Sequence, residues 1–435
     1  MAPPNPHLVA RMQGHRLSIF AEMSTLAVQT GAINLGQGFP DTDGPTEVRD
    51  AAVAAIRAGH NQYPPDRGIP ELRQAVSDHQ ARFYGQEVDP GDVMVSTGAS
   101  EAIGAAILAL VSEGDEVVVF EPYFDHYATS VALAGGRRRV VRLREPDLSF
   151  DVADLESAIG PRTRLILLNT PHNPTGKVFD AEELGHVARL AIRHDLLVVT
   201  DEVYEHLVYD GGRHIPMATL SGMAERTLTI SSGGKSFGFT GWKIGWANGP
   251  ADMVSAVLTA KQSLTYVSGG PFQHAMVTAL GLDDGYFSQL ADDLEGKRDL
   301  LGDGLRSAGF EVFPTAGTYF VTADIRPLGF DDGVAFCMSM PERCGVVAVP
   351  SVVFYDDGDA GRHLIRFAFC KQPEILAEAE ASRQMARRPG SSGARSARTR
   401  GRARMVDRVS DAMAPDTRTS SSVVPPRVRS GPRTT

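Results

Sequence analysis

The sequence predicts an α/β protein, with a mostly parallel sheet in a large domain and a smaller α+β domain after it. Three observations favour this fold class. The chain has 435 residues, which is enough for two or three domains. Short apolar runs alternate with helical segments, and such strand–helix–strand units form parallel sheets with right-handed crossovers. After Ala308 the pattern changes to short strands mixed with helices.

The strands of the large domain are predicted from four short apolar runs. These runs are EVVVF (116–120), RLILL (164–168), LLVVT (196–200) and TLTIS (227–231). Between the second and third runs, Asp180 is expected to cap a helix that continues to about His194. Glu183 lies three residues after Asp180 and completes a capping box. Longer helices are expected over residues 251–266 and 286–308.

The smaller domain is predicted from four more short strands, at residues 310–313, 319–324, 346–350 and 364–369. The change of pattern also sets the expected domain boundaries. We expect an N-terminal arm with part of the small domain (1–45), the large domain (46–285), the small C-terminal domain (286–386) and a basic tail (387–435).

The composition is that of a globular protein, with 42% hydrophobic and 22% charged residues. No run of about 18 apolar residues occurs, so no membrane partner is expected. The N-terminus lacks the long apolar run of a secretory signal. Three cysteines are too few for a disulfide framework, and a reduced, cytoplasmic location is therefore expected.

Charge is distributed unevenly along the chain, whose net charge is −10. Residues 387–435 contain 12 Arg, no Lys and 3 Asp, and the rest of the chain carries −19. An acidic body argues against a nucleic-acid partner. The tail lacks Leu, Ile, Phe, Tyr and Trp, so we predict that it is disordered and dispensable. A basic arm that binds nucleic acid is the alternative.

Polar side chains follow three of the predicted strands at the point where each strand ends. Asn169 follows RLILL, Asp201 follows LLVVT, and Lys235 follows TLTIS after a short SGG segment. Ligands of open α/β sheets bind beyond the carboxyl ends of the strands. A lysine beside a carboxylate suits a pyridine aldehyde: the lysine forms a Schiff base, and the carboxylate keeps the ring nitrogen protonated.

Six motifs extend this pattern along most of the chain, from about residue 19 to 371. They are NLGQGFPD (34–41), NQYPPDRG (61–68), NTPHNPTG (169–176), TDEVYEHLVYD (200–210), SSGGKSFGFTGWKIGW (231–246) and RFAFCK (366–371). With these motifs the sequence resembles a class I aminotransferase that depends on pyridoxal 5′-phosphate. The resemblance implies fold type I, ping-pong transfer of an amino group between an amino acid and a 2-oxo acid, and a homodimer.

The resemblance implies roles around the cofactor ring. Lys235 would be the Schiff-base lysine and the acid/base at the substrate α-carbon. Asp201 would pair with the pyridine nitrogen, and Tyr204 and Asn173 would bond the ring hydroxyl oxygen. Phe124, in EPYFDHY, would stack on the face of the ring.

Further roles are implied for the phosphate and the substrate. The phosphate ligands would be the helix start at Gly98, Ala99 and Ser100, then Ser232 and Lys243, and Tyr63 from the other subunit. Arg366 would grip the substrate α-carboxylate, because its planar fork matches two oxygens. Gly36 would offer backbone to that carboxylate, and Asn173 would also lie at the substrate.

Other chemistry is weakly indicated. Residues 234–238 match the GxSxG pattern of hydrolases, but the following GFTGW is too rich in glycine for the helix that pattern requires. His172 is expected in a loop and His206 in a helix, and neither has a partner at metal-ligand spacing, so no metal is expected. A regulator that only binds the cofactor is disfavoured because Lys235 is present.

The substrate follows less directly from the sequence. The overall pattern is most similar to the branch with kynurenine, glutamine, methionine and N-succinyldiaminopimelate aminotransferases. We rank N-succinyldiaminopimelate:2-oxoglutarate transfer, a step of lysine biosynthesis, first. The alternatives are kynurenine, methionine or glutamine transamination, and a C–S β-lyase on the same fold.

Overall fold

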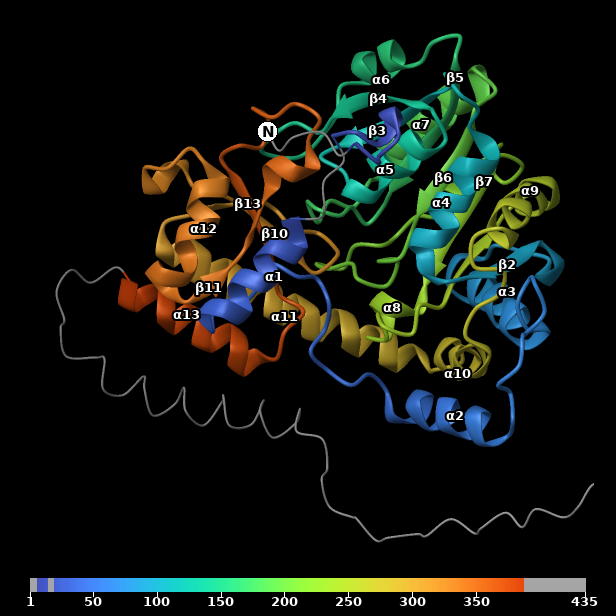
Figure 1. The fold of residues 1–435 in the computed structure, drawn as a ribbon, viewed down its shortest axis with the longest axis horizontal. Coiled ribbons are helices and arrows are strands. Elements are labelled where there is room, and N and C mark those ends of the chain that lie inside the picture. Colours follow the sequence, from blue (N-terminus) through green and yellow to red (C-terminus); the bar gives the residue numbers. More distant parts are fainter. Residues whose placement is uncertain (1–5, 15–18, 387–435) are drawn as a thin grey trace, which may run out of the picture. The chain divides into compact units, whose positions relative to one another are not determined.

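A seven-stranded sheet lies at the centre of the fold (Figure 1). The computed structural model describes residues 6–14 and 19–386. In spatial order the strands are β2 (Val93–Ser96), β8 (Gly245–Asn248), β7 (Thr227–Ser232), β6 (Leu197–Asp201), β5 (Thr163–Asn169), β3 (Glu116–Glu121) and β4 (Arg137–Arg142). Six of these strands run in one direction, and β8 runs in the opposite direction between β2 and β7. The mostly parallel sheet confirms the predicted α/β fold class.

Helices cover both faces of this sheet, as its buried apolar strands require. One face packs against α4 (Gly98–Leu110), α5 (Asp125–Leu133) and α9 (Ala251–Gln262). The other face packs against α6 (Val152–Ala158) and α7 (Ala181–Arg193) (Figure 1). The sheet is therefore fixed between two apolar layers.

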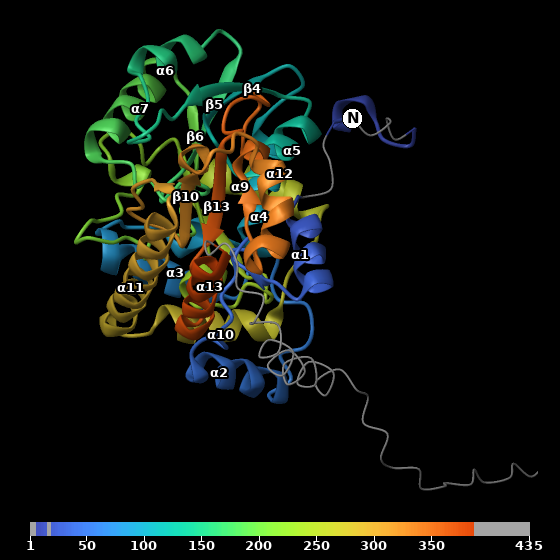
Figure 2. The same cartoon turned by 90° about the vertical axis from the view of Figure 1, so that its left-hand side faces the viewer.

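A second, antiparallel sheet has the strand order β12 (Val349–Pro350), β13 (Leu364–Ala368), β10 (Phe320–Asp324) and β9 (Glu311–Val312). Its core includes residues of α1 (Ile19–Thr30), α11 (Asp284–Ala308), α12 (Gly333–Cys344) and α13 (Pro373–Ala386). Figure 2 shows α13 beside α11, below β10 and β13. A short parallel pair, β1 (Ile33–Asn34) with β11 (Val346–Val347), joins the N-terminal segment to this part of the chain.

A third group of helices packs around β2 and β8. It contains α2 (Thr46–Arg57), α3 (Pro70–Tyr84) and α10 (Gly270–Leu280). The short helix α8 (Gly233–Ser236) follows β7 directly. Five 3₁₀ helices complete the described elements: residues Ala10–Met12, Pro90–Asp92, Met217–Thr219, Arg326–Leu328 and Ser351–Phe354.

The predicted elements of the large sheet agree with the structure. All four predicted strands are present, and the capping box of Asp180 and Glu183 begins α7. The β5–α7–β6 unit is parallel, as predicted. No helix in the described part of the chain is long and apolar enough to cross a membrane.

Three expectations about elements were wrong. The helix predicted over 251–266 ends at Gln262, and Tyr266 has a φ of 66°, in the left-handed region that helices exclude. The strand predicted at 346–350 is divided, because its first part pairs with β1 and its last part with β13. His206 lies in a turn after β6 rather than in a helix. The predicted tail, 387–435, lies outside the described residues.

Candidate active site

A cavity of about 290 Å³ lies where the strands β5, β6 and β7 end. Most of the predicted site residues line it: Gly98, Ala99, Ser100, Phe124, Asn173, Asp201, Tyr204, Ser232, Lys235, Lys243 and Arg366. Its volume suits a small organic ligand. Side chains from both sheets and from the N-terminal segment face this one space.

Lys235 reaches the cavity from α8, the short helix that begins as soon as β7 ends. Its Nζ atom lies 5.6 Å from the ring centre of Tyr204 and 5.7 Å from that of Tyr319. Burial lowers the pKa of Lys235 from 10.5 to about 8. About a tenth of this amine is therefore uncharged at pH 7, far more than in an ordinary lysine, and this fraction can act as a nucleophile or a base.

Asp201 is the last residue of β6, and its side chain is buried at the cavity wall. The Tyr127 hydroxyl donates a 2.6 Å hydrogen bond to Oδ2, and the Val203 N–H donates a 3.4 Å bond to Oδ1. Burial raises the pKa of this carboxyl group, although these hydrogen bonds and Lys235 oppose the rise. A cationic ligand group placed against Asp201 would compensate the buried charge.

The N-terminus of α4 forms another wall. The Thr97 side chain at its N-cap does not bond the first N–H groups, which have no partner within the helix. Gly98 has a φ of 74°, and a Cβ atom there would lie 3.1 Å from Lys243 Nζ. A Cβ atom on Gly245 would lie 2.6 Å from the Gly98 carbonyl carbon. Glycines thus let the backbone N–H groups and the lysine approach one point, an arrangement typical of phosphate sites.

Arg366, on β13, is a buried cation with no ion pair among the described residues. Its guanidinium donates to Asn173 Oδ1 at 2.7 Å and to the Gly36 carbonyl at 3.3 Å. It lies 3.9 Å from the ring centre of Phe320, and its Nε atom has no hydrogen-bond partner. Burial lowers its pKa to about 10. A carboxylate ligand would satisfy both the charge and the free donor.

Two predicted residues do not line the cavity. Tyr63 is 81% exposed, and its ring meets the ring of Tyr266 edge-on with centres 5.6 Å apart. Gly36 lies beside the cavity through its carbonyl contact with Arg366, while its N–H donates to Asn34 Oδ1. Any role of these two residues at a ligand remains a prediction.

Several residues of the site were missed by the sequence reasoning. The cavity also contains Phe20, Gln37, Gly38, Phe39, Ile103, Val203, Gly234, Phe239, Thr240, Ile244 and Phe320. Gln37 to Phe39 belong to the NLGQGFPD motif, and Phe239 and Thr240 to the motif around Lys235, so these motifs were a usable signal. Tyr127, whose hydroxyl bonds Asp201, was also missed, although it lies about one helical turn after the predicted residue Phe124.

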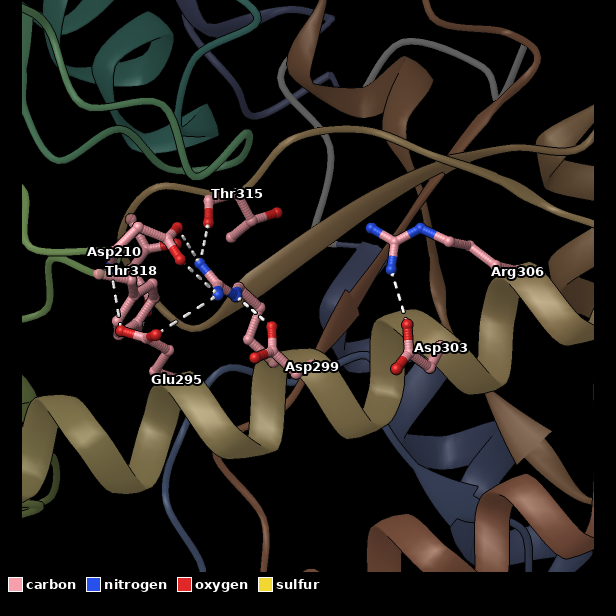
Figure 3. A network of polar contacts seen from close by, with 9 residues as sticks. Asp210, Glu295, Asp299, Asp303, Arg306, Thr315 and Thr318 are labelled. Atoms are coloured by element: carbon pink, nitrogen blue, oxygen red, sulfur yellow. Dashed lines mark hydrogen bonds and ion pairs between the residues drawn. The ribbon is translucent and has the colours of Figure 1, made fainter.

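A polar network holds the segment that carries Asp201 and Tyr204. Arg298 of α11 pairs with Asp210 at 2.6 Å and donates to the Thr315 carbonyl at 3.0 Å. Figure 3 shows Asp210, Glu295 and Asp299 around this guanidinium. These bonds tie the turn after β6 to α11 and to the loop before β10.

The groups around the cavity define the ligand they would complement. They need an anion at the start of α4, a cation beside Asp201, an electrophile within reach of Lys235 and a carboxylate at Arg366. Residues 30–379 match the family described as aminotransferase class I and II. The chain belongs to this family. The match confirms the resemblance predicted from the motifs, and this aminotransferase is an enzyme.

Three relatives of this aminotransferase are named for three different activities. It is 48% identical over 383 residues to the probable N-succinyldiaminopimelate aminotransferase of Mycobacterium tuberculosis, covering 85% of this chain and 96% of that protein. It is 37% identical to the methionine aminotransferase of Escherichia coli, with the same coverage. It is 36% identical to kynurenine–oxoglutarate transaminase 3 of mouse, covering 85% of this chain and 88% of that protein.

Solved structures agree with this assignment. The N-succinyldiaminopimelate aminotransferase from Mycobacterium tuberculosis superposes with a TM-score of 0.85 and covers 87% of this aminotransferase and 100% of that chain. An aspartate aminotransferase of Thermus thermophilus, 31% identical, gives a TM-score of 0.81 over 88% of this chain and 100% of that one. The predicted fold type I is thereby confirmed.

Proposed function

We propose that this aminotransferase uses bound pyridoxal 5′-phosphate to move an amino group between N-succinyldiaminopimelate and 2-oxoglutarate. The observation that carries the choice of substrate is the 48% identity over 383 residues to a relative with that name. Relatives named for methionine or kynurenine reach only 37% and 36%. On this proposal the enzyme serves lysine biosynthesis.

The residues of the cavity fit the cofactor group by group. When bound, the cofactor supplies an aldehyde for Lys235 and a cationic ring that withdraws electrons from the substrate α-carbon. Asp201 would keep the ring nitrogen protonated, because a positively charged ring would offset the cost of burying its carboxylate. Phe124, Tyr204 and Asn173 line the cavity; Phe124 would stack on the ring, and Tyr204 and Asn173 would bond its hydroxyl oxygen.

The phosphate belongs at the start of α4. The N–H groups of Gly98, Ala99 and Ser100 would bind it, and Ser232 and Lys243, which also line the cavity, would complete the site. The Gly98 position supports this role, because a side chain there would occupy the space next to Lys243 Nζ.

Lys235 moves the proton at the substrate α-carbon. Its pKa of about 8 makes the uncharged amine, which a base requires, far more abundant near neutral pH than in an ordinary lysine. Arg366 holds the α-carboxylate with the help of Asn173, and its Nε provides the donor that the carboxylate satisfies. Gly36 orients the guanidinium through its carbonyl.

Reduction with borohydride tests the cofactor assignment. Treatment of the native enzyme should fix the cofactor to one peptide containing Lys235. The chain has six lysines, at positions 177, 235, 243, 261, 297 and 371, so peptide mapping separates them all. Lys235→Ala should stay folded and lose both the label and transamination, while Lys297→Ala should keep the label. A label on Lys243 would overturn the assignment.

A panel of amino donors tests the substrate. N-succinyl-LL-diaminopimelate, kynurenine, methionine and glutamine are compared with 2-oxoglutarate and with pyruvate as acceptors. We expect the highest kcat/KM for the succinylated donor with 2-oxoglutarate. A higher value for methionine or kynurenine would replace the proposed substrate. Release of ammonia and pyruvate from cystathionine, without transfer, would establish the C–S β-lyase instead.

A further inference from the structure

Two histidines and a glutamate meet behind the active site. His79 belongs to α3, and Glu205 and His206 lie in the turn after β6. The Nε2 atoms of the two imidazoles are 2.7 Å apart, and one potential ligand atom from each of the three residues lies within 4.8 Å of the others. The sequence did not predict this cluster, because 127 residues separate the histidines.

The cluster is largely shielded from solvent. His79 and Glu205 are buried, and His206 is partly buried. Glu205 is buried and accepts a 2.6 Å hydrogen bond from Ser231 Oγ. Carboxylate oxygens have further lone pairs, so this bond does not block a second contact.

The imidazole pair leaves one polar atom unsatisfied. If the two Nε2 atoms share a hydrogen bond, His79 Nδ1 remains buried without a partner. Buried polar atoms without partners are uncommon and costly. An ion bound to the two Nε2 atoms would leave this Nδ1 atom as it is, and the support for an ion is the closeness of the three ligand atoms.

We propose that His79, Glu205 and His206 bind one divalent transition-metal ion, with Zn²⁺ as the best match. Two imidazole nitrogens and one carboxylate oxygen are an ordinary zinc donor set, with water in the fourth position. Zinc–nitrogen bonds of about 2.0–2.1 Å place two tetrahedral ligands about 3.3 Å apart. The Nε2 atoms need to separate by only about 0.6 Å from their present distance, which small side-chain rotations supply.

The neighbouring charges permit a cation. Arg82 is the cationic side chain that most affects both histidines, but it forms an ion pair with Asp284 and lies over the ring of Phe83. His214 is occupied by Glu202 at 2.7 Å and is not a candidate ligand. His206 is only partly buried, which gives an ion a route from solvent.

Metal binding here would support the catalytic wall. Glu205 follows Tyr204 in the chain, and its partner Ser231 precedes Ser232. A metal ion that fixes Glu205 would therefore also fix the backbone that carries two of the cavity residues. The three ligands themselves are structural residues that do not line the cavity.

Zinc titration of the holoenzyme tests the proposal. The enzyme is treated with a chelator, exchanged into buffer and titrated with ZnCl₂ by calorimetry. We expect each chain to bind one Zn²⁺ ion tightly and the melting temperature to rise. Co²⁺ should give the visible absorption of a four-coordinate ion. His79→Gln and His206→Gln should each weaken Zn²⁺ binding by more than about 100-fold, beyond the usual effect of an outer-shell partner.

A matched control is the other histidine pair. The rings of His60 and His274 have centres 3.9 Å apart, and within residues 6–14 and 19–386 no carboxylate is placed with this pair as a third ligand. His274→Gln should leave the tight binding of one Zn²⁺ ion unchanged. Circular dichroism and the cofactor absorption show whether each variant is folded. Absence of tight binding in the parent enzyme, equal binding in folded His206→Gln, or loss of binding in His274→Gln would overturn the proposal.

Discussion

Burial of charge is the main property of the active-site residues. Asp201 and Arg366 are both buried, and neither forms an ion pair with another described residue. An uncompensated buried charge destabilises a fold, so such groups persist where a ligand completes them. The opposite directions of the two pKa shifts, upward for the acid and downward for the base, reflect the same missing partners.

Lys235 should capture the cofactor at a lower pH than an ordinary lysine. Its pKa is lowered from 10.5 to about 8, so the uncharged amine forms as the pH rises through about 8. The rate at which apoenzyme binds pyridoxal phosphate should therefore increase between about pH 7 and about pH 9 and then level off. Stopped-flow absorbance measures this rate. A rate that keeps rising tenfold per pH unit above about pH 9 would contradict the lowered pKa.

Asp201 should act through its charge. Asp201→Ala should reduce turnover by several orders of magnitude, because an unprotonated ring withdraws electrons poorly. Asp201→Glu should retain more activity. Tyr127→Phe removes only the hydrogen bond to Oδ2 and should cost about 1.5–3 kcal/mol in kcat. Single-turnover kinetics of the amino-acid half-reaction measure each effect. Near-normal turnover in Asp201→Ala would show that Asp201 has no role in the mechanism.

Arg366 should bind the carboxylate that both half-reactions share. Arg366→Ala should weaken every amino acid and 2-oxo acid together, by about 2–5 kcal/mol, the usual loss when a buried charge pair is broken. Arg366→Lys should not restore affinity, since an ammonium cannot form the two parallel bonds. Dissociation constants for both substrate classes decide this point. If Arg366→Ala weakens the binding of only the amino acids or only the 2-oxo acids, then Arg366 recognises a substrate side chain rather than the shared carboxylate.

Sheet geometry located the polar residues that end parallel strands, and the motifs of the resemblance supplied the other predicted site residues. Asn169, Asp201 and Ser232 end parallel strands, so their common location follows from sheet geometry. The aromatic surroundings of Arg366 come from Phe20, Phe320 and Phe354, which lie in distant parts of the chain. Contacts of that kind depend on tertiary packing, which no local pattern encodes.

The antiparallel strand β8 is one of three strands of the large sheet that the sequence patterns did not reveal, the others being β2 and β4. It lies between β2 and β7, and its first residue, Gly245, lies directly against the backbone at the start of α4. The pattern identified the motif around Lys235, which extends into this strand, but not the direction of the strand. Strand direction is set by pairing with neighbours, and GWAN is too short to show it.

Gly245→Ala should weaken cofactor binding through the backbone of α4. The added Cβ atom would lie 2.6 Å from the Gly98 carbonyl carbon and 2.7 Å from Ala99 N, so the helix start must shift. Such overpacking typically costs about 1–3 kcal/mol, and here it displaces the anion site. Gly241→Ala is the control, because a Cβ atom there meets nothing within 4 Å. Titration of both apoenzymes with pyridoxal phosphate should show weaker binding only for Gly245→Ala.

At the scale of the whole molecule, the cavity requires parts that lie far apart in sequence. The large sheet supplies Asp201 and Lys235, the second sheet supplies Arg366, and the N-terminal segment supplies Gln37. On the proposed function, the second sheet would hold the substrate carboxylate, and the large sheet would hold the cofactor.

The phosphate site should be completed by Tyr63 of a second copy of the chain. Tyr63 is 81% exposed and lies outside the cavity, although its motif resembles a loop that reaches the phosphate of a neighbouring subunit. We expect a homodimer in which Tyr63 completes the partner's phosphate site. Tyr63→Phe should keep the dimer and weaken cofactor binding by about 0.5–1.5 kcal/mol, the net value of one hydrogen bond. Light scattering measures the mass of the active species, and cofactor titration measures the loss. A fully active monomer, or unchanged cofactor affinity in Tyr63→Phe, would refute this arrangement.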